Sequence, residues 1–260
     1  GKPAQKAGIE AGDIVILVLQ HGIELIQAYF GCILHGAIPS IMPFLTEKLN
    51  PERYRTDLAS LITITKPSAI ITYQEFEKEI KSAIKPGSSV RKVIVVERVQ
   101  QIMTVPAFHG LGRKPDDIVL LQHSSGTTGL QKGVALSHKA VFNQLESYKK
   151  AIHLDSEDVI VSWLPLYHDM GLIACFLMPC LLRIPLVIMS PFEWVRAPYK
   201  LLSLVSAYKG TLCWLPNFAY NFCADKIRDN QLENVNLRSL RAVINCSEPV
   251  RWDSHQKFIS

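Results

Sequence analysis

Short apolar runs alternate with stretches of helical spacing along most of this chain, and the alternation predicts an α/β fold. Ile14 to Leu19 is a run of β-branched residues and leucine, which is typical of a buried strand. From His21 to His35 the apolar positions recur every three or four residues, which predicts a helix that ends at Gly36. Ala37 to Phe44 is again an extended apolar run. Strand, helix and strand in this order predict a βαβ unit, and such units build parallel sheets with helices on their faces.

The same rhythm continues through the rest of the chain. The expected elements are helices over Pro51–Leu61, Glu75–Ile84 and Lys139–Ala151, a helix that begins at Pro216, and strands over Ala69–Thr72, Val93–Val96, Val159–Leu164, Thr211–Leu215 and Leu240–Ile244. Residues 98–116 contain two prolines and two glycines, which indicates a connecting segment. We therefore predict mostly parallel sheets flanked by helices, with a first αβ subdomain over residues 1–97 and a second over residues 117–260.

One long apolar stretch, Gly171 to Met189, has the length of a membrane-spanning helix. Pro179, Arg183 and Pro185 interrupt it, so a buried helix followed by a buried strand explains the stretch better. We therefore expect no transmembrane segment.

Composition narrows the class of protein only slightly. Nearly half of the 260 residues are apolar, which is enough for a substantial core. The 28 basic and 23 acidic residues give a net charge of +5 without a basic run, so nucleic acid is not an expected partner. The six cysteines show no metal-ligand spacing, so we expect no zinc site and interpret them as reduced thiols of a cytoplasmic protein.

The densest polar chemistry follows the apolar run Ile118 to Leu121. The ten residues from 124 to 133 read SSGTTGLQKG, with four hydroxyl side chains, three glycines and one lysine. Glycines let the backbone approach a ligand, successive N–H groups form a concave nest for an anion, and hydroxyls and a lysine add donors and charge. We predict a loop that binds a polyphosphate through Ser124, Ser125, Gly126, Thr127, Thr128, Gly129 and Lys132.

The spacing in this segment excludes two familiar phosphate loops. Its glycines and lysine fit neither the Walker pattern nor the Rossmann pattern. The alternative is a flexible Ser/Gly linker, but linkers rarely lie between two apolar strand-like runs.

With these residues in view, SSGTTGLQKG resembles the phosphate loop of the adenylate-forming enzymes, and it departs from that loop only at Gln131, where the family usually has proline. The family comprises acyl-CoA synthetases, fatty acyl-AMP ligases, peptide-synthetase adenylation domains and luciferase. The opening βαβ unit also resembles the start of that fold. The resemblance covers about Gly12 to Phe258 and implies that the loop holds the outer phosphates of ATP.

A second motif, PLYHDMGL at Pro165 to Leu172, follows the expected strand Val159–Leu164. Judged without a family, a His-Asp pair that lacks further ligands at metal-binding spacing is more simply a hydrogen-bonded structural pair. The longer form WLPLYHDMGLI resembles the branch that contains fatty acyl-AMP ligases, which implies that Tyr167 and His168 lie where the carboxylate substrate meets ATP. We treat Asp169 as structural, because a carboxylate is stabilised at the N-terminus of the helix that follows.

Two later segments carry candidates through the same resemblance. PNFAYNFCADKI resembles a helix that borders the acyl pocket of fatty acyl-AMP ligases, and ordinary core packing is the alternative. The implied pocket residues are Trp214, Asn217, Phe218 and Tyr220. The turn after the last strand resembles the NGAEPV loop whose backbone lies against adenine, with Cys-Ser in place of Gly-Ala, and a simple strand-to-helix turn is the alternative. The implied adenine-binding residues are Asn245, Cys246, Ser247, Glu248 and Pro249.

Taken together, the resemblance implies an AMP-forming acid–thiol or acyl-AMP ligase. Such an enzyme uses ATP and Mg²⁺ to convert a fatty or similar apolar carboxylic acid to an acyl-adenylate, and then passes the acyl group to coenzyme A or acyl carrier protein. Lys132 and His168 are the candidate catalytic residues. Family members continue well beyond Ser260, with a magnesium-binding glutamate and a mobile C-terminal domain. We therefore expect a fragment with little activity of its own, and a non-catalytic nucleotide- or acyl-binding module is the alternative.

Overall fold

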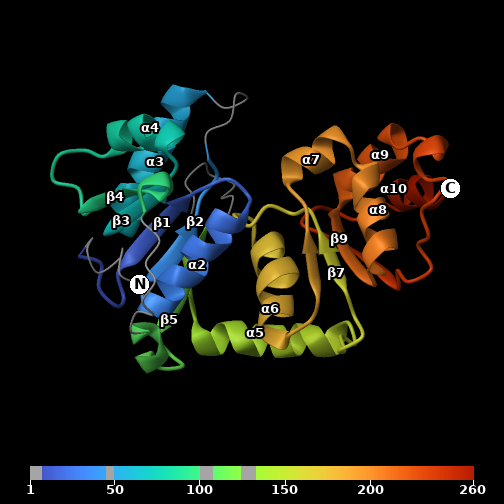
Figure 1. The fold of residues 1–260 in the computed structure, drawn as a ribbon, viewed down its shortest axis with the longest axis horizontal. Coiled ribbons are helices and arrows are strands. Elements are labelled where there is room, and N and C mark those ends of the chain that lie inside the picture. Colours follow the sequence, from blue (N-terminus) through green and yellow to red (C-terminus); the bar gives the residue numbers. More distant parts are fainter. Residues whose placement is uncertain (1–7, 45–49, 100–107, 124–132) are drawn as a thin grey trace. The chain divides into compact units, whose positions relative to one another are not determined.

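The computed structural model describes residues 8–44, 50–99, 108–123 and 133–260 (Figure 1). The chain divides into two compact units, residues 1–142 and 143–260. Each unit contains a four-stranded parallel sheet with helices packed against it. This confirms the predicted α/β class with mostly parallel sheets.

The first unit is built on a sheet with the strand order β2-β1-β3-β4. Its strands are β1 (Ile14–Val18), β2 (Ile38–Ile41), β3 (Ala69–Thr72) and β4 (Lys92–Val95). All neighbours in this sheet are parallel, and β1 lies between β2 and β3. The residues of β1 from Val15 to Val18 are wholly buried, as expected for a strand of a parallel sheet that is covered on both faces. The predicted opening βαβ unit is therefore confirmed.

The helices of the first unit are α2 (Ile23–His35), α3 (Pro51–Thr65) and α4 (Glu77–Ala83), with the 3-10 turn η1 (Gln74–Phe76) before α4. Gly36 ends α2 with a φ of 90°, a left-handed conformation that glycine adopts without strain. Asn50 caps α3 by accepting hydrogen bonds from the N–H groups of Glu52 and Arg53. Helix α3 runs one turn further than predicted, because Ile62 is still buried in the core against Ile70 and Ile80.

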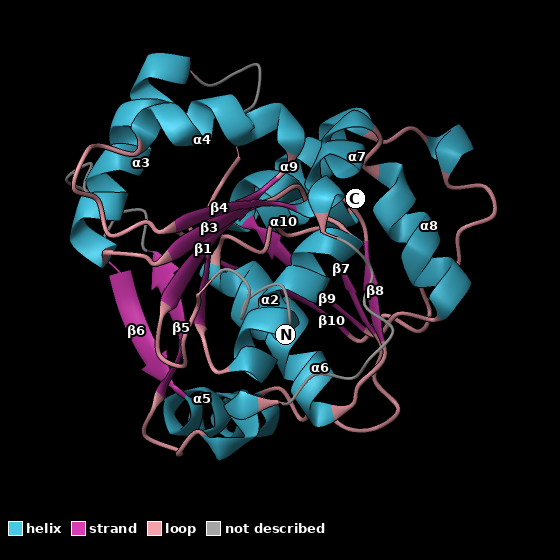
Figure 2. Ribbon diagram, turned by 60° about the vertical axis from the view of Figure 1, so that its left-hand side comes forward, coloured by secondary structure: helices cyan, strands magenta, loops and turns pink. Residues whose placement is uncertain are grey.

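Two further strands of the first unit, β5 (Ile118–His123) and β6 (Gly133–Ser137), form an antiparallel pair (Figure 2). The 3-10 turns η2 (Val96–Arg98) and η3 (His109–Gly112) precede them. Strand β5 lies against β2 of the first sheet. For this reason the division between the compact units falls at Phe142, further along the chain than the connecting segment 98–116 in which the sequence suggested a boundary.

The second unit is built on a parallel sheet with the strand order β10-β9-β7-β8. Its strands are β7 (Ile160–Ser162), β8 (Leu186–Ile188), β9 (Leu212–Pro216) and β10 (Ala242–Cys246). Its helical elements are α5 (His138–Ala151), the π-helix η4 (Met170–Leu177), α6 (Met178–Leu182), α7 (Pro191–Arg196), α8 (Tyr199–Tyr208), α9 (Asn217–Lys226), η5 (Asp229–Gln231) and α10 (Trp252–Ile259), of which α5 begins before the division. The Ser137 hydroxyl accepts a hydrogen bond from the Ala140 N–H at 3.2 Å, so Ser137 caps the N-terminus of α5.

The apolar stretch Gly171 to Met189 folds as η4, α6 and β8, and residues Gly171, Leu172 and Ala174 to Pro179 are buried. The Asp169 carboxylate accepts a hydrogen bond from the Met170 N–H at 2.7 Å, so this residue caps η4 as the sequence predicts. Within the part of the chain that the structure describes, no helix has the length and apolar character needed to cross a bilayer.

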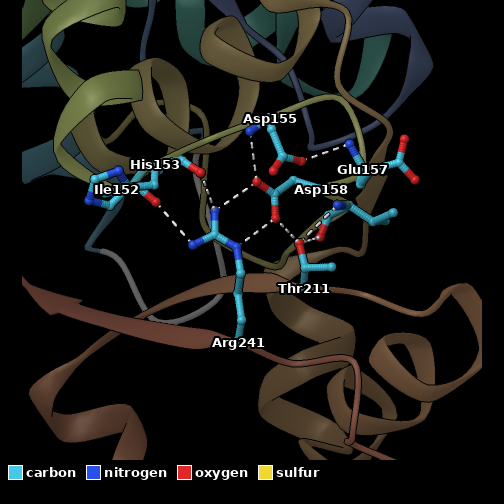
Figure 3. Close-up of polar contacts among 8 residues, drawn as sticks. Ile152, His153, Asp155, Glu157, Asp158, Thr211 and Arg241 are labelled. Atoms are coloured by element: carbon cyan, nitrogen blue, oxygen red, sulfur yellow. Dashed lines mark hydrogen bonds and ion pairs between the residues drawn. The ribbon is translucent and has the colours of Figure 1, made fainter.

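An ion pair between the buried Asp158 carboxylate and the partly exposed Arg241 side chain joins the amino ends of three strands in the second sheet (Figure 3). Asp158 precedes β7, Thr211 precedes β9 and Arg241 precedes β10. The Asp158 carboxylate accepts from Arg241 Nε at 2.8 Å, from Arg241 Nη2 at 2.7 Å and from the Thr211 hydroxyl at 2.5 Å. Arg241 also donates to the carbonyl oxygens of Ile152 and His153 at 3.0 and 3.1 Å. The starts of β7, β9 and β10 are thus fixed to one another and to the end of α5.

Candidate functional site

Most sequence candidates of the second unit lie at the carboxyl edge of its sheet, whereas Trp214 lies within β9. Strand β7 leads into the turn with the PLYHDMGL motif, β9 leads directly into α9, and β10 leads into the loop 247–251 that ends at α10. The three strands are parallel neighbours, so these segments leave the sheet at the same edge. This is the edge at which open α/β sheets bind ligands.

The Tyr167–His168 turn is compact. The His168 N–H donates to the Pro165 carbonyl at 3.1 Å, and the Leu172 N–H donates to the His168 carbonyl at 2.8 Å. A Cβ placed on Gly171 would lie 2.3 Å from the Pro165 carbonyl oxygen, so glycine is required for η4 to begin this close to the turn. The His168 side chain is 52% exposed, which leaves its ring open to a substrate.

The two aromatic side chains of this turn differ in their surroundings. Tyr167 is partly covered, and burial raises the pKa of its hydroxyl. Its ring lies 6.2 Å from the His168 ring. His168 Nδ1 lies 3.5 Å from an oxygen of the exposed Asp169 carboxylate, and the hydrogen bond from His168 lowers the pKa of Asp169. The His-Asp neighbours therefore interact, as the structural interpretation of the motif predicts, while the histidine stays accessible.

An aromatic cluster lies beside this turn, and sequence reasoning missed most of it. The Trp163 and Trp194 rings are stacked, 3.6 Å apart and 8° from parallel. Phe218 meets both rings edge-on at 6.3 and 6.2 Å, and Phe222 lies 5.1 Å from Trp194. The two tryptophans are buried, whereas Phe218 is 48% exposed. The cluster offers an apolar surface at the carboxyl edge, formed by residues that follow β7, β8 and β9.

Three of the four candidates for the acyl pocket are buried in the second unit. Trp214 is wholly buried, and its indole N–H donates to the Tyr148 hydroxyl at 2.7 Å. Tyr220 stacks on His255 with ring centres 4.5 Å apart. Asn217 is 5% exposed and makes hydrogen bonds to three other residues. Only Phe218 presents a large exposed surface.

The loop candidates after β10 lie on the surface. Ser247, Glu248 and Pro249 are exposed, and Asn245 is half-buried near the end of strand β10. Glu248 accepts a hydrogen bond from the Phe218 N–H at 3.0 Å, which joins this loop to the first turn of α9. The side chain of Cys246 lies outside the described parts of the structure. The candidate loop is thus exposed and attached to the aromatic cluster through α9.

The predicted phosphate loop, Ser124 to Lys132, lies outside the described residues. Its two flanking strands, β5 and β6, are described. His123, the last residue before the loop, is buried, and its Nε2 atom lies 2.6 Å from the Ser40 hydroxyl oxygen. Burial lowers the pKa of His123 to about 4, so the ring is neutral near pH 7. Sequence reasoning did not single out this pair, because Ser40 and His123 are 83 residues apart.

The described residues contain no group of three or more histidine, cysteine, aspartate or glutamate side chains that could hold a metal ion. They therefore provide no cage for the Mg²⁺ that the family resemblance implies. A magnesium ion that accompanies a nucleotide keeps several waters and is bound largely by phosphate oxygens.

The chain is thus an α/β protein with its candidate site at the carboxyl edge of a parallel sheet, and comparison with known proteins supplies the family. Residues 5–259 match the family model described as AMP-binding enzyme, so the chain belongs to the AMP-binding enzyme family. This confirms the resemblance found in the SSGTTGLQKG and PLYHDMGL motifs.

Two curated relatives are fatty acid ligases. The chain is 38% identical over 189 residues to the medium-chain-fatty-acid–[acyl-carrier-protein] ligase TtuA of Teredinibacter turnerae, covering 70% of this chain and 29% of the relative. It is 30% identical over 258 residues to the ligase JamA of Moorena producens, which has the same description, covering 97% of this chain and 43% of the relative.

Solved structures give the same grouping. A fatty acyl-adenylate ligase from L. pneumophila, in complex with acyl adenylate and pyrophosphate, is 31% identical and superimposes with a TM-score of 0.82. That match covers 98% of this chain and 44% of the solved chain. The chain thus spans less than half the length of the proteins it matches.

Proposed function

We propose that the protein to which this chain belongs activates a fatty or similar apolar carboxylic acid with ATP. A carboxylate oxygen attacks the α-phosphate, the bond to pyrophosphate breaks, and an acyl-adenylate forms. The thiol sulfur of acyl carrier protein or coenzyme A then attacks the acyl carbon, a thioester forms, and AMP leaves together with the thiol proton. The observation that carries the proposal is the carboxyl edge of the second sheet, where the Tyr167–His168 turn, the aromatic cluster and the loop after β10 leave neighbouring strands.

Each part of this edge suits one part of the reaction. His168 is exposed beside Tyr167 and has donors suited to a carboxylate. Phe218, with Trp163 and Trp194 behind it, offers apolar surface to an acyl chain. Residues 245–249, the end of β10 and the exposed start of the loop that follows it, are the segment that we assign to the adenine ring. No enzyme nucleophile is required, because such reactions depend on positioning and on stabilising charge.

The phosphate loop remains a prediction of the sequence. We propose that the hydroxyls and backbone of Ser124 to Gly129, with Lys132, hold the outer phosphates of ATP together with Mg²⁺. We also propose a cytoplasmic location, which is supported by the free state of Cys32, Cys175, Cys180, Cys213 and Cys223.

Replacement of Lys132 tests the proposal directly. In the whole protein, Lys132→Ala should lower the rate of acid-dependent pyrophosphate exchange with ATP at least tenfold, because a charged contact contributes about 1.5–3 kcal/mol. Lys139→Ala is the matched control, since Lys139 follows soon after Lys132 in the chain, has an exposed side chain and forms an ion pair with Asp116 at 3.9 Å. An exchange rate that is equal in the two variants would remove Lys132 from the mechanism.

A non-catalytic nucleotide- or acyl-binding module is the second candidate for the 260-residue chain, because the chain covers only 29–44% of the proteins that it matches. Calorimetry with ATP and with a long-chain acid distinguishes the two. Binding without any acyl-adenylate in mass spectrometry supports the module, and formation of acyl-adenylate excludes it.

A further inference from the structure

One buried amide holds the loop that follows β10. The Oδ1 atom of Asn217 accepts hydrogen bonds from Asn245 Nδ2 at 3.2 Å and from the Arg251 N–H at 3.0 Å. Its Nδ2 atom donates to the Ser254 hydroxyl at 3.1 Å. Since a backbone N–H can only donate, the Arg251 contact fixes which end of the Asn217 amide is the oxygen. Asn217 therefore forms hydrogen bonds at both ends of the loop, with Asn245 near the end of β10 and with Arg251, the residue that precedes α10.

The loop is attached to α9 at a second point. Glu248, in the middle of the loop, accepts a hydrogen bond from the Phe218 N–H at 3.0 Å. Phe218 and Asn217 are the first two residues of α9. The first turn of α9 is thus the support on which the loop rests, and it lies there because β9 and β10 are parallel neighbours in register, with Leu215 opposite Asn245.

The loop backbone is strained at Ser247, which lies between the attachments at Asn245 and Glu248. Ser247 has a φ of 72°, in the left-handed region that a serine rarely adopts. Such a conformation persists only where the surrounding contacts over-determine it, and it is often found at ligand sites. Asn217 and Glu248 supply those contacts, while the residues from 247 to 250 remain exposed.

We propose that Asn217 is a positioning residue for the base of ATP: its amide holds residues 247–250 in the shape that receives adenine. This inference rests on the proposed function, because it takes these residues as the adenine loop. It assigns to Asn217 a role different from that of an acyl-pocket residue. Asn217 touches the loop and not the nucleotide, so its loss acts on the base and leaves the phosphates and the acid unaffected.

The test is Asn217→Ala in the whole protein, with Asn221→Ala as the matched control. Asn221 lies one turn later on α9 and donates to the same Ser254 hydroxyl at 3.0 Å, and its bond leads to α10 and not to the loop. Acid-dependent pyrophosphate exchange gives kcat and the KM values for ATP and acid. Inhibition by adenosine, which has no phosphate, and by inorganic tripolyphosphate, which has no base, separates the two halves of the nucleotide site.

Asn217→Ala should raise the KM for ATP about tenfold and weaken inhibition by adenosine by a similar factor, the size expected when a loop loses one or two supporting hydrogen bonds. The KM for the acid and the inhibition by tripolyphosphate should stay within about twofold of the unmodified protein, as should every constant of Asn221→Ala. If Asn217→Ala does not fold, Glu248→Ala releases the loop at an exposed position and should give the same selective change.

Two outcomes overturn the inference. Either Asn217→Ala matches Asn221→Ala in its KM for ATP, or it weakens adenosine and tripolyphosphate inhibition equally, as a general loss of structure would. These results are distinct from failure of the proposed function, in which the unmodified protein exchanges no pyrophosphate with any acid. That last result would remove the function and the inference together.

Discussion

Replacement of Arg241 by alanine should destabilise the second unit far more than the loss of an ordinary surface ion pair. Arg241 makes two hydrogen bonds to the Asp158 carboxylate and two to backbone carbonyls. The Asp158 side chain is only 3% exposed. Without Arg241 this buried carboxylate keeps the Thr211 hydroxyl and the Asp155 N–H as its donors. Removing one partner of a buried pair costs about 3–5 kcal/mol, because the other charge stays buried without a counter-charge, and the 38% exposure of the Arg241 side chain places the expected cost at the lower end of that range.

A surface ion pair of the same unit gives a reference for the expected loss of unfolding free energy. Lys200 and Glu193 are 2.8 Å apart, but their side chains are 46% and 43% exposed. Pairs of this kind contribute about 1 kcal/mol or less. Lys200→Ala is therefore the matched control, and Arg241→Ala should cost at least about 2 kcal/mol more. The difference measures burial, since both substitutions remove one basic side chain.

Urea unfolding followed by tryptophan fluorescence is the appropriate assay. The four tryptophans, at positions 163, 194, 214 and 252, all lie in the second unit, so the signal reports on that unit. Equal losses for Arg241→Ala and Lys200→Ala would refute the reasoning. Asp158→Asn added to Arg241→Ala should recover part of the loss, because it removes the uncompensated charge.

The pair also has a pH signature. Burial alone raises the pKa of Asp158, but hydrogen bonds from Arg241, Thr211 and the Asp155 N–H outweigh it and lower the pKa to about 2. A folded-state pKa below the unfolded value of about 3.9 stabilises the fold above pH 4, and this stabilisation is lost as the pH falls towards 2. This acid-dependent loss should be absent from the double variant, which lacks the Asp158 carboxylate.

Two further predictions concern the turn of the candidate site and the first unit. Gly171→Ala should cost about 2 kcal/mol of unfolding free energy, since its Cβ would lie 2.3 Å from the Pro165 carbonyl oxygen, and it should lower pyrophosphate exchange by moving Tyr167 and His168. The control is Gly31→Ala in helix α2, which should be neutral or stabilising because its Cβ meets nothing within 4 Å. Equal effects of the two substitutions on stability would contradict the steric argument. Burial lowers the pKa values of His21 and His123 to about 4, below the unfolded value of 6.5, so the unfolded chain takes up protons first and stability should fall by about 2 kcal/mol per histidine between pH 7.5 and 5. Chemical unfolding at the two pH values checks this, and His123→Gln should reduce the difference.

The arrangement of elements could be predicted because each buried strand is a short apolar run. The range Ala69–Thr72 agrees with β3 in the structure, and the helix ended by Gly36 is confirmed. Boundaries were less accurate where tertiary pairing decides them. The expected strand Leu240–Ile244 is shifted to Ala242–Cys246, because β10 takes its register from β9.

The residues of the candidate site show the same difference between features that are local in the sequence and features that depend on tertiary pairing. Contiguous motifs could be recognised from the sequence, and the Asp169 cap was predicted from its place before an apolar helix. Contacts between segments that are distant in the sequence could not be predicted from it. Trp163 and Trp194 stack from different elements, and Asn217 meets Asn245 and Arg251 at separations of 28 and 34 residues. No local pattern marks such pairs, because they form only when parallel strands bring their ends together.

Helix α5 has a practical consequence for dissecting the chain. The helix is continuous from His138 to Ala151, while the compact units divide at Phe142. A truncation at that division would remove the Ser137 cap and the buried Val141. It would leave Leu145, which is buried, and Tyr148, whose hydroxyl accepts a hydrogen bond from the Trp214 indole N–H, on a shortened helix. The remaining nine residues are too few to hold helical shape on their own. Expression of the second unit alone should therefore begin at or before Ser137.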